Sequence, residues 1–216
     1  MNIAVLGGTG NEGFGLGFRW AAAGHTLIIG SRLAEKGARA AADMQQRLPD
    51  AAISGTDNLS AAQQADVVVL SVPYAAQAPT LEAVQPALAG KLLVTVVAPT
   101  GEKAARVWRL PSGLSAAEEA QAQVGDDVRV VAAFQNVGAH HLLDRDHQMD
   151  CDVLVCGAAK ADKELVIQLC ADAGMRGVNA GALQNASVAE GLTSVLIAIN
   201  VIHKVKSAGI RITGLD

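Results

Sequence analysis

Short apolar runs alternate with longer amphipathic stretches along residues 1–180, and this order predicts alternating strands and helices. The short runs are rich in Val, Ile and Leu, as buried parallel strands are, and they cover residues 2–6, 26–30, 52–54, 66–72, 91–97, 128–134 and 152–156. The longer stretches predict helices over 10–23, 33–48, 58–64, 74–88, 115–123 and 160–172, with Asn58 capping the third. The predicted fold class is α/β, with a doubly wound, Rossmann-type parallel sheet.

Residues 185–206 follow a different pattern, because apolar side chains occupy most of the girth of the predicted helix. One face carries Val188, Leu192, Val195, Leu196 and Ile199, and Ile197, Val201 and Ile202 lie elsewhere. Such a helix must be buried, so we expect it to cover the sheet and a second subunit of a homodimer. Its longest apolar run, Val195–Ile202, is short for a bilayer and is interrupted by Asn200, so no membrane span is expected.

The first predicted strand runs directly into a glycine motif, Gly8-x-Gly10-x-x-Gly13, which opens a helix. Gly8 permits a turn too tight for a Cβ atom, Gly10 lets backbone N–H groups approach a pyrophosphate, and Gly13 lets the helix sit close to the sheet. The N-terminal amides and dipole of the helix then face the phosphates. Because strand, motif, helix and second strand follow in the required order, the sequence predicts dinucleotide binding rather than an ordinary glycine-rich turn.

The second strand ends in Gly30-Ser31-Arg32, where an NAD-binding protein normally carries Asp or Glu for the ribose 2′-hydroxyl. An acid would repel a 2′-phosphate, whereas the Ser31 hydroxyl, the planar Arg32 guanidinium and the Lys36 ammonium would bind it. Thr9 offers another hydroxyl. These residues predict NADP, and the alternative is that Arg32 and Lys36 are ordinary solvated charges at a helix start.

Composition narrows the function further. The 216 residues are 50% hydrophobic, 18% charged and 3% aromatic, with a formal net charge of −4, which gives no electrostatic reason to bind nucleic acid. Cys151, Cys156 and Cys170 are odd in number and lack metal-ligand spacing, which favours buried, reduced thiols. The chain enters a strand without signal-peptide character, so we expect a cytoplasmic location.

The familiar proton-transferring pairs are missing from the strand ends, where ligands of such folds bind. Tyr74, the single tyrosine, is followed four residues later by Ala78 rather than by Lys, and Lys204 is followed by Ala208 rather than by Asn. The simplest interpretation is hydride transfer to a conjugated acceptor, in which geometry suffices and no catalytic side chain is required.

A run of potential metal ligands lies between residues 140 and 152, where three histidines and four aspartates cluster. Adjacent histidines cannot share one face of a regular element, and the charges fit a solvated loop between two strands. We therefore expect no metal here. Instead, we expect His140 or His141 to reach the acceptor or its anionic tail.

Several motifs occur together along the chain: Gly7-Gly8-Thr9-Gly10-Asn11-x-Gly13, Gly24-His25, Gly30-Ser31-Arg32-x-x-x-Lys36, Pro73 before an aromatic residue, Val155-Cys156-Gly157, and Gly181-x-Leu183-x-Asn185-x-x-x-x-Glu190-x-Leu192-Thr193. With them, nearly the whole chain resembles the NADPH-dependent reductases of the 8-hydroxy-5-deazaflavin coenzyme F-420. Two departures lie on the acceptor side: Gln135-Asn136-Val137-Gly138 stands where His-Thr-Ile-Pro occurs in the family, and Tyr74 stands where Trp occurs.

The resemblance implies an NADP-binding domain over residues 1–180 and a C-terminal helical segment, 181–216, that contributes the acceptor site and the dimer contact. It implies a hydride passing between NADP(H) and coenzyme F-420. The expected cofactor-binding residues are Gly8, Thr9, Gly10, Asn11, Glu12, Gly13, Ser31, Arg32, Lys36, Val72, Ala98 and Ala139, and the expected acceptor-binding residues are Gln135, Asn136, His140 and His141. Two alternatives stay open: reduction of a flavin, pterin or imine by NADPH, and a non-catalytic NADPH-sensing module.

Overall fold

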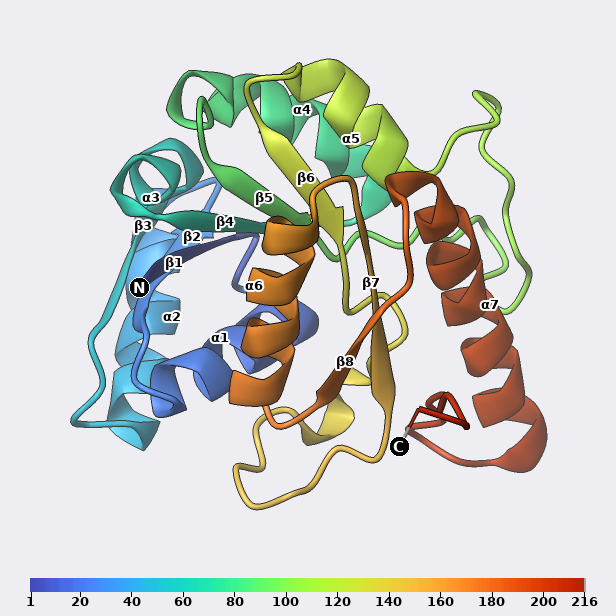
Figure 1. The fold of residues 1–216 in the computed structure, drawn as a ribbon. Helices are drawn as coiled ribbons and strands as arrows, with labels where there is room; N and C mark the ends of the chain where they lie inside the picture. Colours follow the sequence, from blue (N-terminus) through green and yellow to red (C-terminus); the bar gives the residue numbers. More distant parts are fainter. Residues whose placement is uncertain (216) are drawn as a thin grey trace.

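Eight strands form one sheet in the computed structural model, which describes residues 1–215. The strand order is β3-β2-β1-β4-β5-β6-β7-β8 (Figure 1). The strands are β1 (Asn2–Leu6), β2 (Thr26–Ser31), β3 (Ile53–Asp57), β4 (Val67–Leu70), β5 (Leu92–Thr95), β6 (Arg129–Ala132), β7 (Asp152–Gly157) and β8 (Arg176–Asn179). The order reverses between β1 and β4, so the edge beside them is the switch point at which ligands of such sheets bind.

The first six strands are parallel, as the sequence predicts, but the end of the sheet is not. β7 pairs antiparallel with β6, and β8, which the sequence analysis did not predict, pairs parallel with β7. A loop without a long helix joins β6 to β7, so the chain returns along the sheet in the opposite direction. The expectation of a wholly parallel sheet is therefore corrected to a mixed one.

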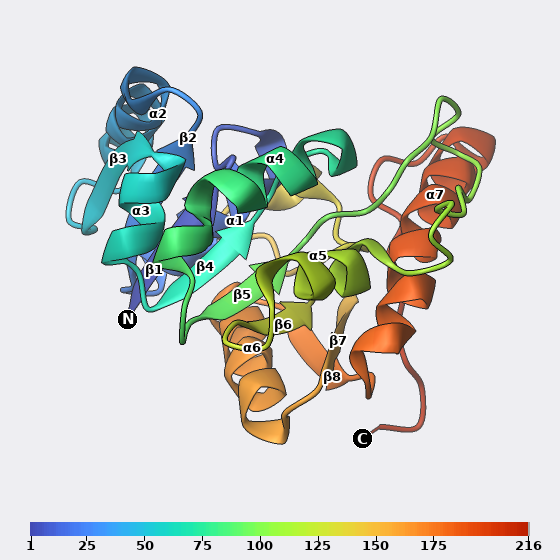
Figure 2. The same cartoon turned by 90° about the horizontal axis from the view of Figure 1, so that it is seen from above.

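Helices cover both faces of the sheet (Figure 2). One core packs α1 (Asn11–Ala22), α2 (Ala34–Arg47) and α6 (Lys160–Asp172) against the strands, and its largest members include Trp20, Met44 and Leu169. The opposite core packs α3 (Asn58–Gln64), α4 (Tyr74–Val84) and α5 (Ala116–Val124). The doubly wound arrangement agrees with the sequence prediction, because unbroken apolar strands such as Val67–Leu70 must be covered on both sides.

The start of α3 differs from the sequence prediction. Asp57, not Asn58, caps the helix, and its carboxylate accepts a bond of 2.9 Å from the backbone N–H of Ser60. Asn58 turns inward instead, and its Oδ1 accepts a bond of 3.3 Å from the N–H of Gly7. The residue expected to cap a helix thus supports the glycine turn.

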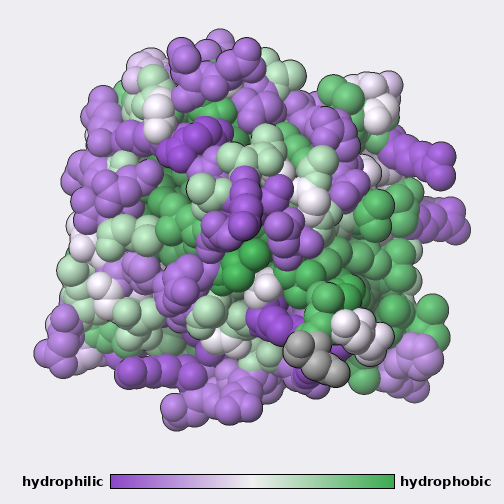
Figure 3. Space-filling model, in the orientation of Figure 1, coloured by the Kyte–Doolittle hydropathy of each residue, from purple (hydrophilic) through white to green (hydrophobic). Residues whose placement is uncertain are grey.

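The C-terminal helix, α7 (Ala186–His203), stands at the edge of the sheet beside α5. In the single chain Val188, Val201 and Ile202 are 64%, 70% and 71% exposed, so the sheet covers only part of the helix, and its burial by a second subunit stays a prediction. Figure 3 shows apolar side chains gathered over this helix. By length and composition, Leu183–His203 could cross a membrane, and 28% of that window is buried. Length and composition alone are weak evidence of a membrane span, so the expectation of none, based on Val195–Ile202, stays a prediction.

The chain beyond α7 returns to the sheet. Asp152, at the start of β7, donates its N–H to the Ile210 carbonyl at 2.8 Å and accepts a bond from the Ile212 N–H at 2.6 Å. The Arg176 guanidinium binds both the Asp152 carboxylate and the Ile212 carbonyl. The end of the chain is thereby tied to β7 and β8.

Candidate active site

The turn between β1 and α1 depends on glycines that leave no room for side chains. Gly7 has φ +70°, and a Cβ atom there would lie 2.4 Å from the Ser71 carbonyl oxygen. A Cβ on Gly8 would lie 2.7 Å from the Val5 oxygen, and one on Gly13 would lie 2.8 Å from Ser71 Oγ. The left-handed backbone therefore falls at Gly7, just before the motif, and Gly13 brings α1 against the end of β4.

Gly10 has a different environment from its neighbours. A Cβ atom there would meet only the Gly7 oxygen, at 3.6 Å, so open space lies in front of it. Gly10 is also the N-cap residue of α1, and no side chain caps the helix. The first-turn amides of α1 are therefore available to an external acceptor, as a pyrophosphate site requires.

A cavity of about 690 Å³ extends from this turn toward the end of β2. Its lining includes the expected Thr9, Gly10, Ser31, Arg32 and Lys36, together with Asn58, Ser71, Val72 and Pro73. No carboxylate belongs to this lining. The nearest acid along the sheet is Asp57, opposite Ser31 in the β2–β3 register, and bonds from Ser60 hold the pKa of its carboxyl below the usual value. A phosphate group bound in this cavity would therefore meet hydroxyls and cations. It would meet no carboxylate of the lining.

A second cavity, of about 300 Å³, continues past Gly10 along the ends of β4, β5 and β6. It contains the expected Glu12, Val72, Ala98 and Gln135, and also Ser71, Pro73, Val96, Phe134, Val137 and Thr193, which the sequence analysis did not assign. The two cavities share Gly10, Ser71, Val72 and Pro73. They therefore form one path along the carboxyl edge of the sheet. The path leads from Arg32 and Lys36 to a mostly apolar end, which is the second cavity.

Two residues that line this apolar end have a buried side-chain oxygen without a hydrogen-bond partner among the described residues: Glu12 Oε1 and Gln135 Oε1. Burial raises the pKa of the Glu12 carboxyl to about 8. Gln135 is fixed by its other groups, since Nε2 donates to the Thr95 carbonyl at 2.9 Å and the Thr193 hydroxyl donates to its own carbonyl at 2.7 Å. Unsatisfied buried acceptors are costly, and in a cavity they indicate a ligand with N–H or O–H donors.

The backbone before Gln135 is strained. Phe134 has φ +74°, although it is not glycine, and its fully buried ring packs edge-on against Trp20 with centroids 5.7 Å apart. Left-handed backbone at a bulky residue persists only where packing enforces it, and it concentrates at functional sites. The kink ends β6 and directs Gln135 to the cavity.

Four expected residues between positions 136 and 141 lie outside these two cavities. Ala139 and His140 line a separate cavity of about 490 Å³ with Thr9, Asn11, Phe14 and Leu143. Asn136 is buried, and its amide donates to the Asp152 carbonyl at 2.7 Å, so it serves packing. The His141 ring stacks on His147 with centroids 4.0 Å apart, away from the apolar end. Of the four predicted acceptor residues, only Gln135 lines the apolar end, and His140 lines the neighbouring cavity.

Arg19 fixes the loop that carries these histidines, a role the sequence analysis missed. Its guanidinium, 6% exposed, donates to the carbonyls of His141, Leu142, Asp144 and His147 at 2.6–3.1 Å. The signal in the sequence was that Arg19 is the single basic residue of α1. One helix, α1, therefore presents free first-turn amides at its N-terminus and fixes the histidine loop through Arg19.

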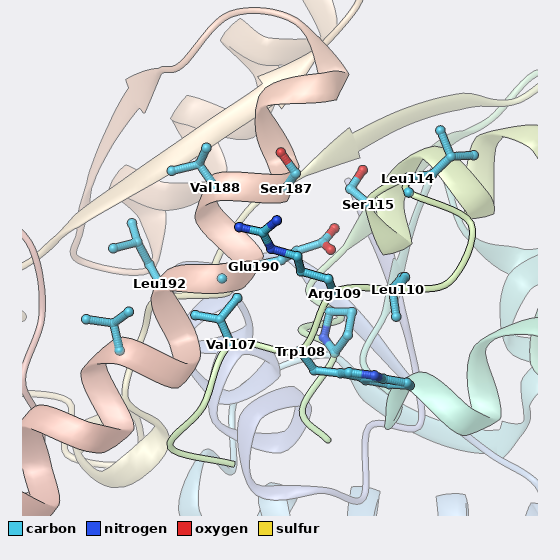
Figure 4. A pocket seen from close by; sticks show the side chains of 14 residues that line it. Val107, Trp108, Arg109, Leu110, Leu114, Ser115, Ser187, Val188, Glu190 and Leu192 are labelled. Carbon is cyan, nitrogen blue, oxygen red and sulfur yellow. The ribbon is translucent and has the colours of Figure 1, made fainter. Parts of the chain in front are cut away.

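A further cavity, of about 460 Å³, lies between α7 and the excursion of residues 100–114. Figure 4 shows the Glu190 carboxyl directed from α7 toward Ser115 and the Arg109 guanidinium between the two segments. The Glu190 carboxylate accepts bonds of 2.8 and 3.0 Å from the N–H groups of Ala116 and Ala117, which start α5. Burial raises the pKa of this carboxyl to about 7.

The excursion is held in place by Tyr74. The Tyr74 hydroxyl donates to the Glu119 carboxylate at 2.6 Å, and its ring contacts Trp108 edge-on with centroids 5.5 Å apart. Burial and the neighbouring Glu119 raise the pKa of Tyr74 to about 12, so the hydroxyl stays protonated at neutral pH. Tyr74 therefore acts as an anchor for the excursion and is not placed as a proton donor.

The fold and the path of cavities define a dinucleotide-binding oxidoreductase of the Rossmann class. The model of the family described as NADP oxidoreductase, coenzyme F420-dependent, matches residues 2–99. The F420-dependent NADP reductase of Methanocaldococcus jannaschii is 41% identical over 225 residues, with 100% of both chains covered. That of Methanothermobacter marburgensis is 40% identical over 222 residues, covering 100% of this chain and 99% of its own.

A solved structure shows the same architecture over the full length. The candidate F420-dependent NADP reductase from Arthrobacter sp. FB24 has a TM-score of 0.80 with 26% identity, and 99% of each chain is covered. The chain belongs to the family of F420-dependent NADP oxidoreductases.

Proposed function

We propose that this protein transfers a hydride between NADP(H) and the 8-hydroxy-5-deazaflavin coenzyme F-420. The observation that carries the proposal is the continuous path from Arg32 and Lys36, past the free amides at Gly10, to the apolar end beside Val72 and Ala98. Its change from cationic to apolar lining matches a nucleotide with a 2′-phosphate at one end and a nicotinamide at the other. The relatives' names supply the acceptor.

The protein's part in the reaction is to bind, orient and exclude water. The first-turn amides of α1 hold the pyrophosphate, and Ser31, Arg32 and Lys36 hold the 2′-phosphate. Val72 and Ala98 give the nicotinamide an apolar setting, which favours close contact with a second flat ring. The hydride then passes between ring carbons, and the bound geometry supplies most of the rate enhancement.

The acceptor approaches from the side of α7. Thr193 lies in the apolar end, and its neighbours Gly191 and Leu192 line the cavity between α7 and the excursion. Ala98 and Pro99 connect the same two cavities at the end of β5. Trp108 and Arg109 suit a flat conjugated ring with an anionic tail, because one offers an aromatic surface and the other a guanidinium.

Spectroscopy tests this function directly. Purified protein mixed with NADPH and oxidised F-420 should bleach the visible absorbance of the deazaflavin, and NADH should be far less effective. Bleaching of a flavin or loss of a pterin signal instead would replace the acceptor. NADPH binding without turnover of any acceptor would leave only a sensing role and would overturn the proposal.

We further infer a homodimer in which the exposed apolar face of α7 contacts α7 of a second copy. Val201 and Ile202, both more than two-thirds exposed, lie at the end of the 18-residue helix that carries this face. A dimer would remove the face from water and hold α7 beside the acceptor cavity. In sedimentation, the protein should run as a dimer and the variant Val201→Glu with Ile202→Glu as a monomer. Gln46→Glu, which adds a carboxylate on the exposed side of α2, is the matched control, and a monomeric wild type would contradict the inference.

We also propose a cytoplasmic location. Cys151, Cys156 and Cys170 are buried and unpaired. Free thiols of this kind suit a reducing compartment. Fractionation of the native host would test it.

A further inference from the structure

Glu12 combines features that the binding of phosphate does not explain. It stands in the first turn of α1 and lines the apolar end of the path, but it does not line the cavity beside Arg32 and Lys36. Oε1 is buried and has no hydrogen-bond partner among residues 1–215. A carboxylate left in this state would be expensive, so the group must be neutral or await a partner.

The surroundings of Glu12 contain no fixed counter-charge. Its cavity is lined by glycine, apolar, hydroxyl and amide residues from β4, β5, β6 and α7, and by no other ionisable side chain. The nearest titratable group that senses it is the Cys151 thiol, before β7, and burial raises the pKa of that thiol to about 11, so it is neutral. On α1 itself, the Arg19 guanidinium is occupied by the carbonyls of the histidine loop. Desolvation alone therefore governs the Glu12 carboxyl.

The proposed position of the nicotinamide places a ligand of variable charge in the same cavity. The ring is neutral in NADPH and carries a positive charge in NADP+. A neutral ring covers the carboxyl and excludes water, which favours the protonated acid, whereas a cation favours the carboxylate. A unit charge beside a carboxyl in a poorly hydrated site shifts its protonation equilibrium by roughly a hundredfold.

We propose that Glu12 is a proton-linked partner of the nicotinamide, protonated beside NADPH and ionised beside NADP+. This inference rests on the proposed nicotinamide position. When the hydride, with its electron pair, leaves the C4–H bond of NADPH and bonds to the deazaflavin ring carbon, the oxidised nicotinamide gains positive charge. Glu12 releases one proton, the ring nitrogen of the reduced acceptor takes up one proton, and Glu12 is reprotonated from solvent after NADP+ leaves.

Gln135 distinguishes a proton-linked role from simple hydrogen bonding. Its free Oε1 faces the same cavity, but an amide cannot ionise at neutral pH. Both oxygens can accept bonds from a carboxamide in either redox state of the nucleotide. Only Glu12 can make affinity depend on redox state and pH together.

The direction of the pH effect follows from the carboxyl equilibrium. Between the lowered pKa in the NADP+ complex and the value of about 8 in the free protein, Glu12 is protonated before binding and ionised afterwards. NADP+ binding should therefore release close to one proton near neutral pH and strengthen roughly tenfold per pH unit in that range. Above about pH 8, Glu12 is already ionised, and the dependence should disappear.

The experiment is isothermal titration calorimetry of NADP+, NADPH and 2′,5′-ADP at pH 7 in buffers of different ionisation enthalpy. A change in protonation of the 2′-phosphate contributes to the proton release of all three ligands. The difference in proton release between NADP+ and NADPH therefore reports the effect of the nicotinamide ring alone. Wild type should release about one proton more with NADP+ than with NADPH. Glu12→Gln should abolish the difference and weaken NADP+ by at least about tenfold while leaving NADPH within about twofold. Glu82→Gln, at an exposed position of α4, should behave as wild type.

Equal proton release with NADP+ and NADPH in wild type would overturn the inference without any variant. A difference that survives Glu12→Gln would overturn it as well. If 2′,5′-ADP binds while either result is found, the nucleotide site stands and only the role of Glu12 fails. If 2′,5′-ADP does not bind, the proposed site itself fails, and the inference fails with it.

Discussion

The nucleotide side and the acceptor side of the cavity are built in different ways. The glycine turn and the cations of the proposed nucleotide side lie within residues 7–36, from the end of β1 to the first turn of α2, and the rest of the lining is Asn58, Ser71, Val72, Pro73, Ala76 and Thr80. The acceptor side takes Gln135 from the end of β6, Thr193 from α7 and Trp108 from the excursion. The first kind of site is recognisable from spacing along the chain. The second exists only after distant segments have packed together.

The largest expected effect falls on the nucleotide side alone. Arg32→Glu replaces a cation in the cavity by an anion and should weaken NADPH by about 2–3 kcal/mol, because a charge-assisted pair is lost. NADH, which lacks the 2′-phosphate, should bind as before, and the KM for the deazaflavin should be unchanged. Titration of both nucleotides checks this, with Arg39→Glu on the exposed side of α2 as the control. Equal losses for NADPH and NADH would refute the phosphate role of Arg32.

Two glycines of the turn separate folding from binding. Gly7→Ala forces a side chain into left-handed backbone and against the Ser71 carbonyl, so the free energy of unfolding should fall by about 1–3 kcal/mol. At Gly10 a methyl group meets only open space, so Gly10→Ala should unfold within about 0.5 kcal/mol of wild type yet bind NADPH poorly. Urea denaturation and nucleotide titration measure the two quantities. Similar destabilisation by both substitutions would mean that Gly10 serves packing rather than the ligand.

Local sequence patterns predicted the parallel part of the sheet because each strand there is an unbroken apolar run between turn residues. β8 was missed because Arg-Gly-Val-Asn has no such run, and its start is secured by the bonds of Arg176 to Asp152 from the neighbouring strand. The antiparallel direction of β7 could not be predicted from its sequence either. It depends on the long loop after β6, which contains no crossover helix and therefore returns the chain antiparallel to β6.

The same distinction holds for the site. Ser31, Arg32 and Lys36 were predictable because their positions after β2 decide their position in the cavity. The partnerless Glu12 oxygen was not, because its burial depends on how segments distant in the sequence pack around it. Asn136 and His141 were expected beside Gln135, yet the turn after Phe134 directs successive residues in different directions.

Glu190 links α7 to the start of α5, and its titration should change the free energy of unfolding. The folded-state pKa, about 7, lies above the ordinary value of 4.5, so this group stabilises the fold at low pH, and that contribution is lost as pH rises through about 7. Between pH 4.5 and 7, wild type should lose about 2–3 kcal/mol relative to Glu190→Gln. Denaturation across this range measures the difference, and Glu12 contributes equally to both proteins. Glu164→Gln, exposed on α6, should follow wild type. Parallel curves for wild type and Glu190→Gln would show that the carboxyl ionises normally.

The smallest effect on the nucleotide is expected from the histidine loop. Changing His140 and His141 together to Ala should leave NADPH affinity within about 0.5 kcal/mol, because the first-turn amides of α1 and the Arg19 contacts to loop carbonyls use backbone groups that the substitution keeps. The KM for the deazaflavin should rise several-fold if His140, beside Thr9 and Asn11, contacts its anionic tail. Steady-state kinetics with each substrate varied in turn separates the two effects, and His203→Ala, exposed at the end of α7, is the control. A large loss of NADPH affinity with an unchanged acceptor KM would assign this cavity to the nucleotide, and the boundary between the two sides would then lie at the loop rather than at the apolar end.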